Sequence, residues 1–321
     1  MALLEVIDLK AYFFTTGGIV RAVDGVSFEI DKGKVMGLVG ESGCGKTTIG
    51  HCLVNLLPKP AGRIVQGQIM FDGEDLATKS QAAMRKYRGN QIAMIVQDPM
   101  SSLDPLFTIG NQISEAIQAH RHMDGGRLQE TVVGLVEKVR IPAPGERIKD
   151  YPHQFSGGMR QRAVGAMALS CGPRLLIADE PTTSLDVTIQ AQYLALLRDI
   201  QESEGLALLF ITHDLGIVAY LCTDVAVMYA GKIVEIAEVR DIYNSPAHPY
   251  TQALIHSVPR ADTRVEKLYG IDGAPPNLVN LPPGCAFAPR CTQKIKRCET
   301  EEFPPTVNIS PGHRVRCWRY V

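Results

Sequence analysis

The apolar residues of this chain follow two different patterns along its length. Short apolar runs at residues 4–9, 25–30, 35–39, 67–71 and 91–97 end at turn-forming residues and predict β-strands. Between residues 100 and 172 the apolar positions recur at helical spacing, as in Ile109, Ile113 and Ile117, with almost no strand signal. We therefore expect a helical subdomain, about residues 98–172, inserted into a strand-rich fold.

Strand character returns after this helical stretch. Apolar runs at 175–178 and 208–211 flank a helical pattern at 187–202, and a strand pair is expected at 224–229 and 232–236. Such a strand-helix-strand rhythm is typical of a parallel sheet covered by helices, so we predict an α/β domain over residues 1–236. Prolines such as Pro246 and Pro249 then interrupt the chain, and residues 237–321 are predicted to form a small, loop-rich region.

Composition and charge narrow the function classes. The 33 Lys and Arg residues against 34 Asp and Glu give a net charge of -1, which offers no general attraction to nucleic acid or anionic lipid. No apolar run approaches the roughly 20 residues that a membrane span needs. The first residues carry Glu5 and Asp8, where a signal peptide would be basic and then apolar. We expect a cytoplasmic protein, with any membrane role through a partner.

A phosphate-binding loop follows the apolar run at 35–39. The spacing of glycine, four residues and Gly-Lys-Thr is that of a P-loop, whose backbone N–H groups surround a phosphate. Lys46 is expected to reach the β- and γ-phosphates of a nucleotide and Thr47 to bind Mg²⁺. The predicted nucleotide-binding residues of this loop are Gly40, Ser42, Gly43, Cys44, Gly45, Lys46, Thr47 and Thr48.

Polar side chains also end two later strands. Asp179 and Glu180 follow the run at 175–178, where open α/β sheets place their ligands. Asp179 suits a Mg²⁺ contact, and Glu180 could polarise the water that attacks a γ-phosphate. His213 ends the next strand, where an imidazole can donate a hydrogen bond to that phosphate.

A second candidate anion site opens an apolar helix at Ser156, Gly157 and Gly158. Small residues and free N–H groups at a helix start bind anions. Because one nucleotide cannot easily use two such sites, we predict that this one faces a nucleotide on another subunit. The predicted assembly is a head-to-tail dimer with ATP between the subunits.

Together these motifs resemble the nucleotide-binding subunit of an ATP-binding cassette (ABC) transporter, an ABC-type P-loop NTPase. Gln97 takes the glutamine-loop position and Asp186 belongs to a Ser-Leu-Asp D-loop, in the order and spacing of the family over about residues 3–236. The signature sequence departs from Leu-Ser-Gly-Gly-Gln, since Phe155 and Met159 occupy its ends. Its Ser-Gly-Gly core is intact, so the resemblance implies a working signature in trans.

The resemblance also implies roles for particular residues. Gln97 would contact Mg²⁺ and the attacking water, and would report the γ-phosphate to the helical subdomain, which would bind helices of a membrane partner. The catalytic residues would be Glu180, His213, Gln97 and Lys46. Phe13 would stack on adenine, although Tyr12 and Phe14 are adjacent and plain packing is the alternative.

The last part of the chain narrows the resemblance further. His248, Pro249 and Tyr250 resemble the His-Pro-Tyr motif of oligopeptide and dipeptide permease ATPases, including nickel importers. The four cysteines that follow are wider apart than in usual zinc sites. Members of this family hold a [4Fe–4S] cluster at such cysteines, which is the expected cofactor, with zinc or unliganded thiols as alternatives. These cysteines are Cys285, Cys291, Cys298 and Cys317.

The resemblance implies an ATPase on the cytoplasmic face of the membrane that drives uptake of di- or oligopeptides. Its partners would be two transmembrane permease subunits, a second ABC ATPase and, indirectly, an extracytoplasmic substrate-binding protein. The second ATPase is expected to be a paralogue, with another copy of this chain as the alternative. The alternatives are an importer for nickel or another small solute, a soluble ABC protein acting on ribosomes or nucleic acid, and a regulator without turnover. A single cassette without long coiled coils disfavours the soluble protein, and Glu180 with His213 disfavours the regulator.

Overall fold

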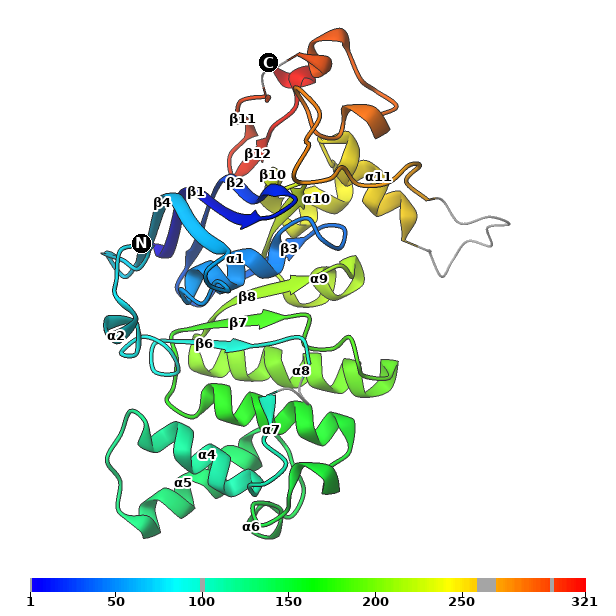
Figure 1. Ribbon diagram of the computed structural model, residues 1–321. Helices are drawn as coiled ribbons and strands as arrows, with labels where there is room; N and C mark the ends of the chain where they lie inside the picture. Colours follow the sequence, from blue (N-terminus) through cyan, green and yellow to red (C-terminus); the bar gives the residue numbers. More distant parts are fainter. Residues whose placement is uncertain (1, 99–101, 259–269, 301–302) are drawn as a thin grey trace. The chain divides into compact units, whose positions relative to one another are not determined.

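The computed structural model describes residues 2–98, 102–258, 270–300 and 303–321 (Figure 1). Contacts between residues divide the chain into two units. The helical unit comprises residues 31–34 and 78–210. The P-loop unit comprises residues 2–30, 35–77 and 211–321, so it contains the phosphate-binding loop and the tail. The predicted boundary at residue 236 stays a prediction.

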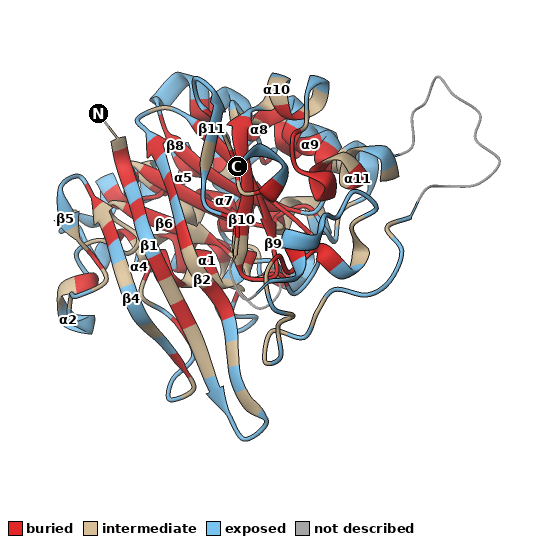
Figure 2. Cartoon of the chain, turned by 90° about the horizontal axis from the view of Figure 1, so that it is seen from above, coloured by how far each residue is buried: buried red, intermediate tan, exposed pale blue. Residues whose placement is uncertain are grey.

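The P-loop unit begins with an antiparallel sheet. Its strands are β1 (Ala2–Thr15), β2 (Gly18–Asp31), β4 (Gly62–Phe71) and β5 (Glu74–Asp75), in the order β2-β1-β4-β5. Buried and exposed positions alternate over part of β1, as Figure 2 shows. The strands are longer than the sequence predicts, because their outer halves are polar and aromatic rather than apolar.

A second set of strands in the P-loop unit carries the phosphate-binding loop. Strand β3 (Val35–Val39) is parallel to β9 (Asp224–Tyr229), which pairs antiparallel with β10 (Lys232–Glu238). The predicted hairpin is confirmed, with Ala230 and Gly231 both at positive φ. Two tail strands that the sequence did not predict extend this set of strands beyond β10. Strand β12 (His313–Val315) pairs antiparallel with β10, and β11 (Val307–Ser310) pairs antiparallel with β12.

The helices of the P-loop unit follow the strands that position them. They are α1 (Lys46–Leu53), α9 (Leu215–Leu221), α10 (Val239–Asn244) and α11 (Pro249–Ser257). The rest of the described tail is loop with short 3₁₀ turns at Ala288–Arg290, Lys296–Glu299 and Trp318–Tyr320. The tail therefore belongs to the P-loop unit rather than to a contact unit of its own.

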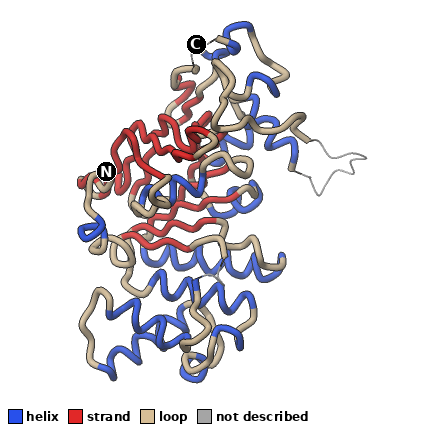
Figure 3. The backbone as a smooth tube through the Cα atoms, in the orientation of Figure 1, coloured by secondary structure: helices blue, strands red, loops and turns tan. Residues whose placement is uncertain are grey.

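The helical unit carries its own strands and a group of helices (Figure 3). Strand β6 (Ile92–Ile95) is parallel to β7 (Leu175–Asp179), and β8 (Ala207–Thr212) comes next in the order. Helices α4, α5 and α7 occupy the stretch predicted to be helical, while its bounds as a subdomain stay a prediction and residues 99–101 lie outside the described part of the chain. The helices of this unit are α2 (Gln81–Met84), α4 (Ile109–Gln118), α5 (Gly125–Lys138), α6 (Pro144–Arg147), η1 (Pro152–Gln154), α7 (Gly157–Leu169) and α8 (Val187–Glu204).

Candidate functional site

Two glycines of the loop that joins β3 to α1 are required by close backbone approach. A Cβ on Gly40 would lie 2.1 Å from the carbonyl oxygen of Met228, and one on Gly45 would lie 1.9 Å from that of Ala22. Both glycines also have positive φ, at 154° and 109°, a region that L side chains rarely adopt. The fold thus holds the loop in a shape that only glycine permits, with Gly45 as the N-cap of α1.

Lys46 lies inside this loop with 5% of its surface exposed. Its Nζ donates to the carbonyl oxygen of Gly40 at 2.7 Å and to that of Glu41 at 3.1 Å. Two backbone carbonyl groups therefore hold the ammonium group at the loop, and Lys46 is itself the first residue of α1. An anion placed there meets both a positive charge and the helix N-terminus.

The other members of the candidate site are predicted at the carboxyl ends of β6 and β7 in the helical unit. Because these strands are parallel and adjacent, the residues that follow them meet at one sheet edge. Gln97 Nε2 donates to Glu180 Oε2 at 3.2 Å, and Thr183 Oγ1 donates to the same oxygen at 3.1 Å. Glu180 has a positive φ of 45°, and such backbone strain clusters at active sites. Asp179, at the end of β7, is buried.

The Ser-Gly-Gly signature begins helix α7 as predicted. Ser156 is the N-cap, and its Oγ accepts from the Met159 N–H at 3.4 Å. A Cβ on Gly158 would lie 2.6 Å from Ile189 Cγ2, whereas a Cβ on Gly157 would meet nothing within 4 Å. Gly158 therefore allows the start of α7 to pack closely against Ile189 of α8. Gly157 has open space next to its Cα. Phe155, which departs from the family pattern, is buried and anchors the helix start.

The remaining predicted residues have local roles in the structure. Asp186 is the N-cap of α8, where its Oδ1 accepts from the Ile189 N–H at 3.0 Å. His213 follows β8 and is exposed, within the same unit as the P-loop. Phe13 is partly buried in β1 and pairs with Gly62. Nucleotide contacts by these three residues stay predictions.

Two tail residues contact the phosphate-binding loop, which sequence reasoning did not find. Tyr250 Oη accepts a hydrogen bond from the Glu41 N–H at 2.9 Å. Arg290 donates to both carboxylate oxygens of Glu41, at 2.6 Å and 2.9 Å. The His-Pro-Tyr motif gave a hint of the first contact, whereas nothing in the sequence connects positions 41 and 290.

The four tail cysteines gather in one neighbourhood. Burial raises the pKa of the Cys285 thiol to about 11, and negative charge at Cys298, Cys317 or Cys291 would raise it further. The Cys285 N–H also donates to the Cys298 carbonyl oxygen at 2.9 Å. Within the described residues, however, no three His, Cys, Asp or Glu side chains are arranged to share a metal ion. The structure therefore does not support the expected iron-sulfur cluster.

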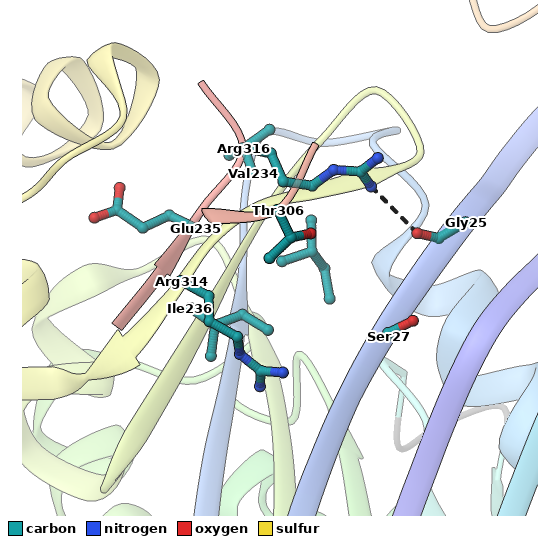
Figure 4. A pocket seen from close by; sticks show the side chains of 9 residues that line it. Gly25, Ser27, Val234, Glu235, Ile236, Thr306, Arg314 and Arg316 are labelled. Carbon is teal, nitrogen blue, oxygen red and sulfur yellow. Dashed lines mark hydrogen bonds between the residues drawn. The ribbon is translucent and has the colours of Figure 1, made fainter. Parts of the chain in front are cut away.

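A separate small cavity lies in the P-loop unit between β2, β10 and the tail (Figure 4). Its volume is about 70 Å³, and Ser27, Thr306, Arg314 and Arg316 are among the residues that line it. Arg316 closes part of it by donating to the Gly25 carbonyl oxygen at 3.3 Å. Ligand sites usually enclose at least about 300 Å³, so this cavity is too small for a nucleotide.

Comparison with known proteins agrees with this geometry. The family model described as "ABC transporter" matches residues 23–183, and the model of the "oligopeptide/dipeptide transporter, C-terminal region" matches residues 234–298. Solved structures with this fold include a dimeric ATP-binding cassette, MJ0796, at 21% identity with a TM-score of 0.66, covering 74% of this chain and 99% of that one. Another is cbiO1 from Clostridium perfringens, at 23% identity with a TM-score of 0.65, covering 76% of this chain and 91% of that one. At these identities the likeness establishes the fold alone.

The fold and the loop thus define a P-loop ATPase of the ABC cassette type. Among the curated relatives, the dipeptide transport ATP-binding protein DppD of Bacillus subtilis (strain 168) is 49% identical over 315 residues, which cover 98% of this chain and 94% of that protein. The oligopeptide transport ATP-binding protein OppD of the same organism is 47% identical, covering 98% and 88%. The chain belongs to the ABC transporter ATP-binding proteins, in the branch with the oligopeptide/dipeptide C-terminal region.

Membership of this family establishes the chain as an ATPase that drives transport. Across the described residues, no helix combines the length and the apolar character that a bilayer crossing requires.

Proposed function

We propose that this chain hydrolyses MgATP to drive import of di- or oligopeptides through membrane subunits. The observation that carries the proposal is its likeness, at 49% and 47% identity over nearly the whole chain, to dipeptide and oligopeptide transport ATP-binding proteins. The match to a transporter-specific C-terminal region favours an importer over a soluble ABC protein that acts on ribosomes or nucleic acid.

In this proposal the phosphate-binding loop holds the triphosphate. Lys46, held by the Gly40 and Glu41 carbonyl oxygens, directs its ammonium group to the β- and γ-phosphates. Thr47, Gln97 and Asp179 supply the oxygen ligands that Mg²⁺ prefers. These assignments rest on the residue types and on the family motif.

Glu180 is the proposed general base. Its carboxylate already accepts hydrogen bonds from Gln97 and Thr183, and these contacts hold the carboxylate in one orientation. In the reaction Glu180 would take a proton from the attacking water, while His213 would donate a hydrogen bond to the γ-phosphate. Gln97 contacts the base directly, so a change at the γ-phosphate would reach the start of the helical subdomain.

The second half of the nucleotide site would come from a partner ATPase, a paralogue in this proposal. Gly157 has open space where a side chain would be, and Ser156 lies at a helix N-terminus, as an anion site requires. Val187, which begins α8 beside the D-loop, leaves 80% of its surface exposed. The signature and the start of α8 lie together, because Gly158 packs against Ile189, so both would face the partner ATPase in this proposal.

The helical unit also offers a surface for a membrane subunit. Leu106 and Phe107 are exposed at 78% and 52%, just after the glutamine loop. A groove of about 410 Å³ is lined by residues of α4 and α5 that include Asn111, Ser114 and Leu128. We propose that a helix of a permease subunit docks here, which would keep this chain at the cytoplasmic face of the membrane. Replacing Leu106 and Phe107 by serine should then abolish co-purification with the permease subunits while ATP binding stays unchanged.

The [4Fe–4S] cluster, with zinc as the alternative, stays a proposal that rests on four thiols sharing one neighbourhood. No step of hydrolysis passes through it. Iron, sulfide and zinc counted in anaerobically purified protein decide this point: about four irons and four sulfides per chain would support the cluster. One zinc per chain would support the alternative. If the protein contains neither iron nor zinc, the thiols are unliganded.

The test of the transported solute is uptake by vesicles that contain the assembled importer and its binding protein. We expect ATP-dependent uptake of a labelled dipeptide or short oligopeptide. Uptake of ⁶³Ni²⁺ without peptide uptake would overturn the peptide assignment and support the nickel alternative.

A further inference from the structure

Glu41, at the second position of the phosphate-binding loop, is held through its side chain, its N–H and its carbonyl group. Its carboxylate receives two hydrogen bonds from Arg290, its N–H donates to Tyr250 Oη, and its carbonyl oxygen accepts from Lys46 Nζ. Arg290 and Tyr250 both belong to the tail, and Lys46 is the residue that reaches the phosphates. Glu41 therefore connects the tail to the catalytic lysine.

The His-Pro-Tyr motif fixes the position of the Tyr250 side chain at the start of α11. His248 is the N-cap of α11, where its Nδ1 accepts from the Tyr250 N–H at 3.0 Å. The Tyr250 ring is buried and packs against Tyr229 and Phe287, with ring centroids 4.6 Å and 5.3 Å away. Because these two aromatic neighbours fix the ring, the hydroxyl is held against the Glu41 N–H.

Arg290 is equally constrained. Its side chain is only 5% exposed, and the ion pair with Glu41 holds its pKa above the usual range. It also donates to the carbonyl oxygens of Asp272 at 2.9 Å and Ile271 at 3.2 Å, and to Tyr229 Oη at 3.3 Å. A planar guanidinium with this many fixed partners holds its target carboxylate in one orientation.

We propose that Arg290 and Tyr250 are positioning residues for ATP binding, which hold Glu41 and through it place Lys46 for the triphosphate. On this account the tail does more than cover the cassette: it sets the geometry of the phosphate-binding loop. Neither residue contacts ATP.

The position of Arg290 in the tail extends the proposal to the thiols. Arg290 ends the 3₁₀ turn Ala288–Arg290, and Cys285 and Cys291 bracket that turn. The Ala288 N–H donates to the Cys285 carbonyl oxygen at 2.9 Å, so the turn is tied directly to the first cysteine. A metal ion held by these sulfurs would fix the turn, so nucleotide affinity is expected to depend on whether that metal is bound.

The experiment is equilibrium binding of a fluorescent ATP analogue with Mg²⁺ to the full-length chain. We expect Arg290→Gln to weaken binding about tenfold, the loss expected of one hydrogen bond between charged groups. Glu41→Gln should cost a similar factor, and the double variant no more than either single one, as for two residues in one interaction. Tyr250→Phe, which keeps the buried ring, should weaken binding by roughly threefold, the loss expected of one neutral hydrogen bond.

Two comparisons separate positioning from plain stability. Lys294→Gln removes a basic tail residue from an exposed ion pair with Glu299 and should leave ATP affinity unchanged. In a Lys46→Ala background, Arg290→Gln should have no further effect, because the residue that it positions is gone. Wild-type affinity in Arg290→Gln and Tyr250→Phe, with only a lowered Tm, would overturn the proposal.

The positioning role of Arg290 and Tyr250 rests on the proposed function, in which the phosphate-binding loop is the ATP site. Binding measurements distinguish failure of that site assignment from failure of the positioning role. A wild-type chain that binds no ATP would overturn the assignment of the loop together with this inference. ATP binding that depends on Lys46 but not on Arg290 or Tyr250 would overturn this inference alone.

Discussion

Glu235 is a buried carboxylate that joins three parts of the P-loop unit. Its side chain in β10 is fully buried and accepts from the backbone N–H groups of Ala247 at 2.7 Å and His248 at 2.8 Å. His313, in the tail strand β12, also contacts this carboxylate, with its Nε2 2.7 Å from Glu235 Oε1. We predict that Glu235→Ala detaches the His-Pro-Tyr segment and the tail strands from β10.

The magnitude follows from what the substitution leaves behind. Two backbone N–H groups and one imidazole lose their acceptor in a buried setting, and each such loss costs about 1–3 kcal/mol. We take about 3–5 kcal/mol, the lower part of the sum of these three losses, as the expected destabilisation. For a domain of roughly 150–250 residues, a loss of about 3–5 kcal/mol corresponds to a fall in Tm of roughly 6–20 °C. Glu235→Gln keeps one carbonyl oxygen and should cost less.

Thermal unfolding of the full chain, followed by circular dichroism, measures the effect. The matched control is Glu299→Ala, which removes a carboxylate of the same tail from an exposed pair with Lys294 and should leave Tm unchanged. If Glu235→Ala and Glu299→Ala unfold at the same temperature, then the buried network does not hold the tail, and the reasoning is wrong.

Two further predictions use other parts of the chain. Gly158→Ala should destabilise the protein by about 1–3 kcal/mol in urea unfolding, because the new Cβ would overlap Ile189, whereas Gly157→Ala should unfold like the wild type. Burial lowers the pKa of His248 to about 3, so the unfolded chain binds a proton that the folded chain refuses between about pH 6.5 and pH 3. Stability should therefore fall as pH drops through this window, and His248→Asn should flatten the fall; an equal slope in both proteins would contradict this.

The parts of the site that are contiguous in sequence could be predicted. The phosphate-binding loop, the Asp179-Glu180 pair and the signature each depend on a few neighbouring residues whose chemistry is local. Their strands were found as well, because β3, β7 and β8 are buried throughout and read as continuous apolar runs. The hydrogen bond between Gln97 and Glu180 agrees with the expectation that parallel neighbours end at one sheet edge.

Element ends and distant contacts could not be predicted in the same way. Helix α1 ends at Leu53, because Asn55, two residues further on, adopts a left-handed conformation with φ 50°. Strands β11 and β12 are short and contain polar residues such as Asn308 and Arg314, so only their pairing with β10 defines them. Glu235 looks like a solvent-facing residue of a strand, since its partners come from segments far along the chain.

The central claim is that this chain hydrolyses ATP with Glu180 as base and that hydrolysis drives uptake. Its most direct test is phosphate release and peptide uptake by the assembled importer with wild-type chain or with Glu180→Gln. We predict that the variant still binds ATP, that its phosphate release falls at least about a hundredfold, as expected for loss of a general base, and that uptake stops. Unchanged phosphate release or unchanged uptake in the variant would contradict the account.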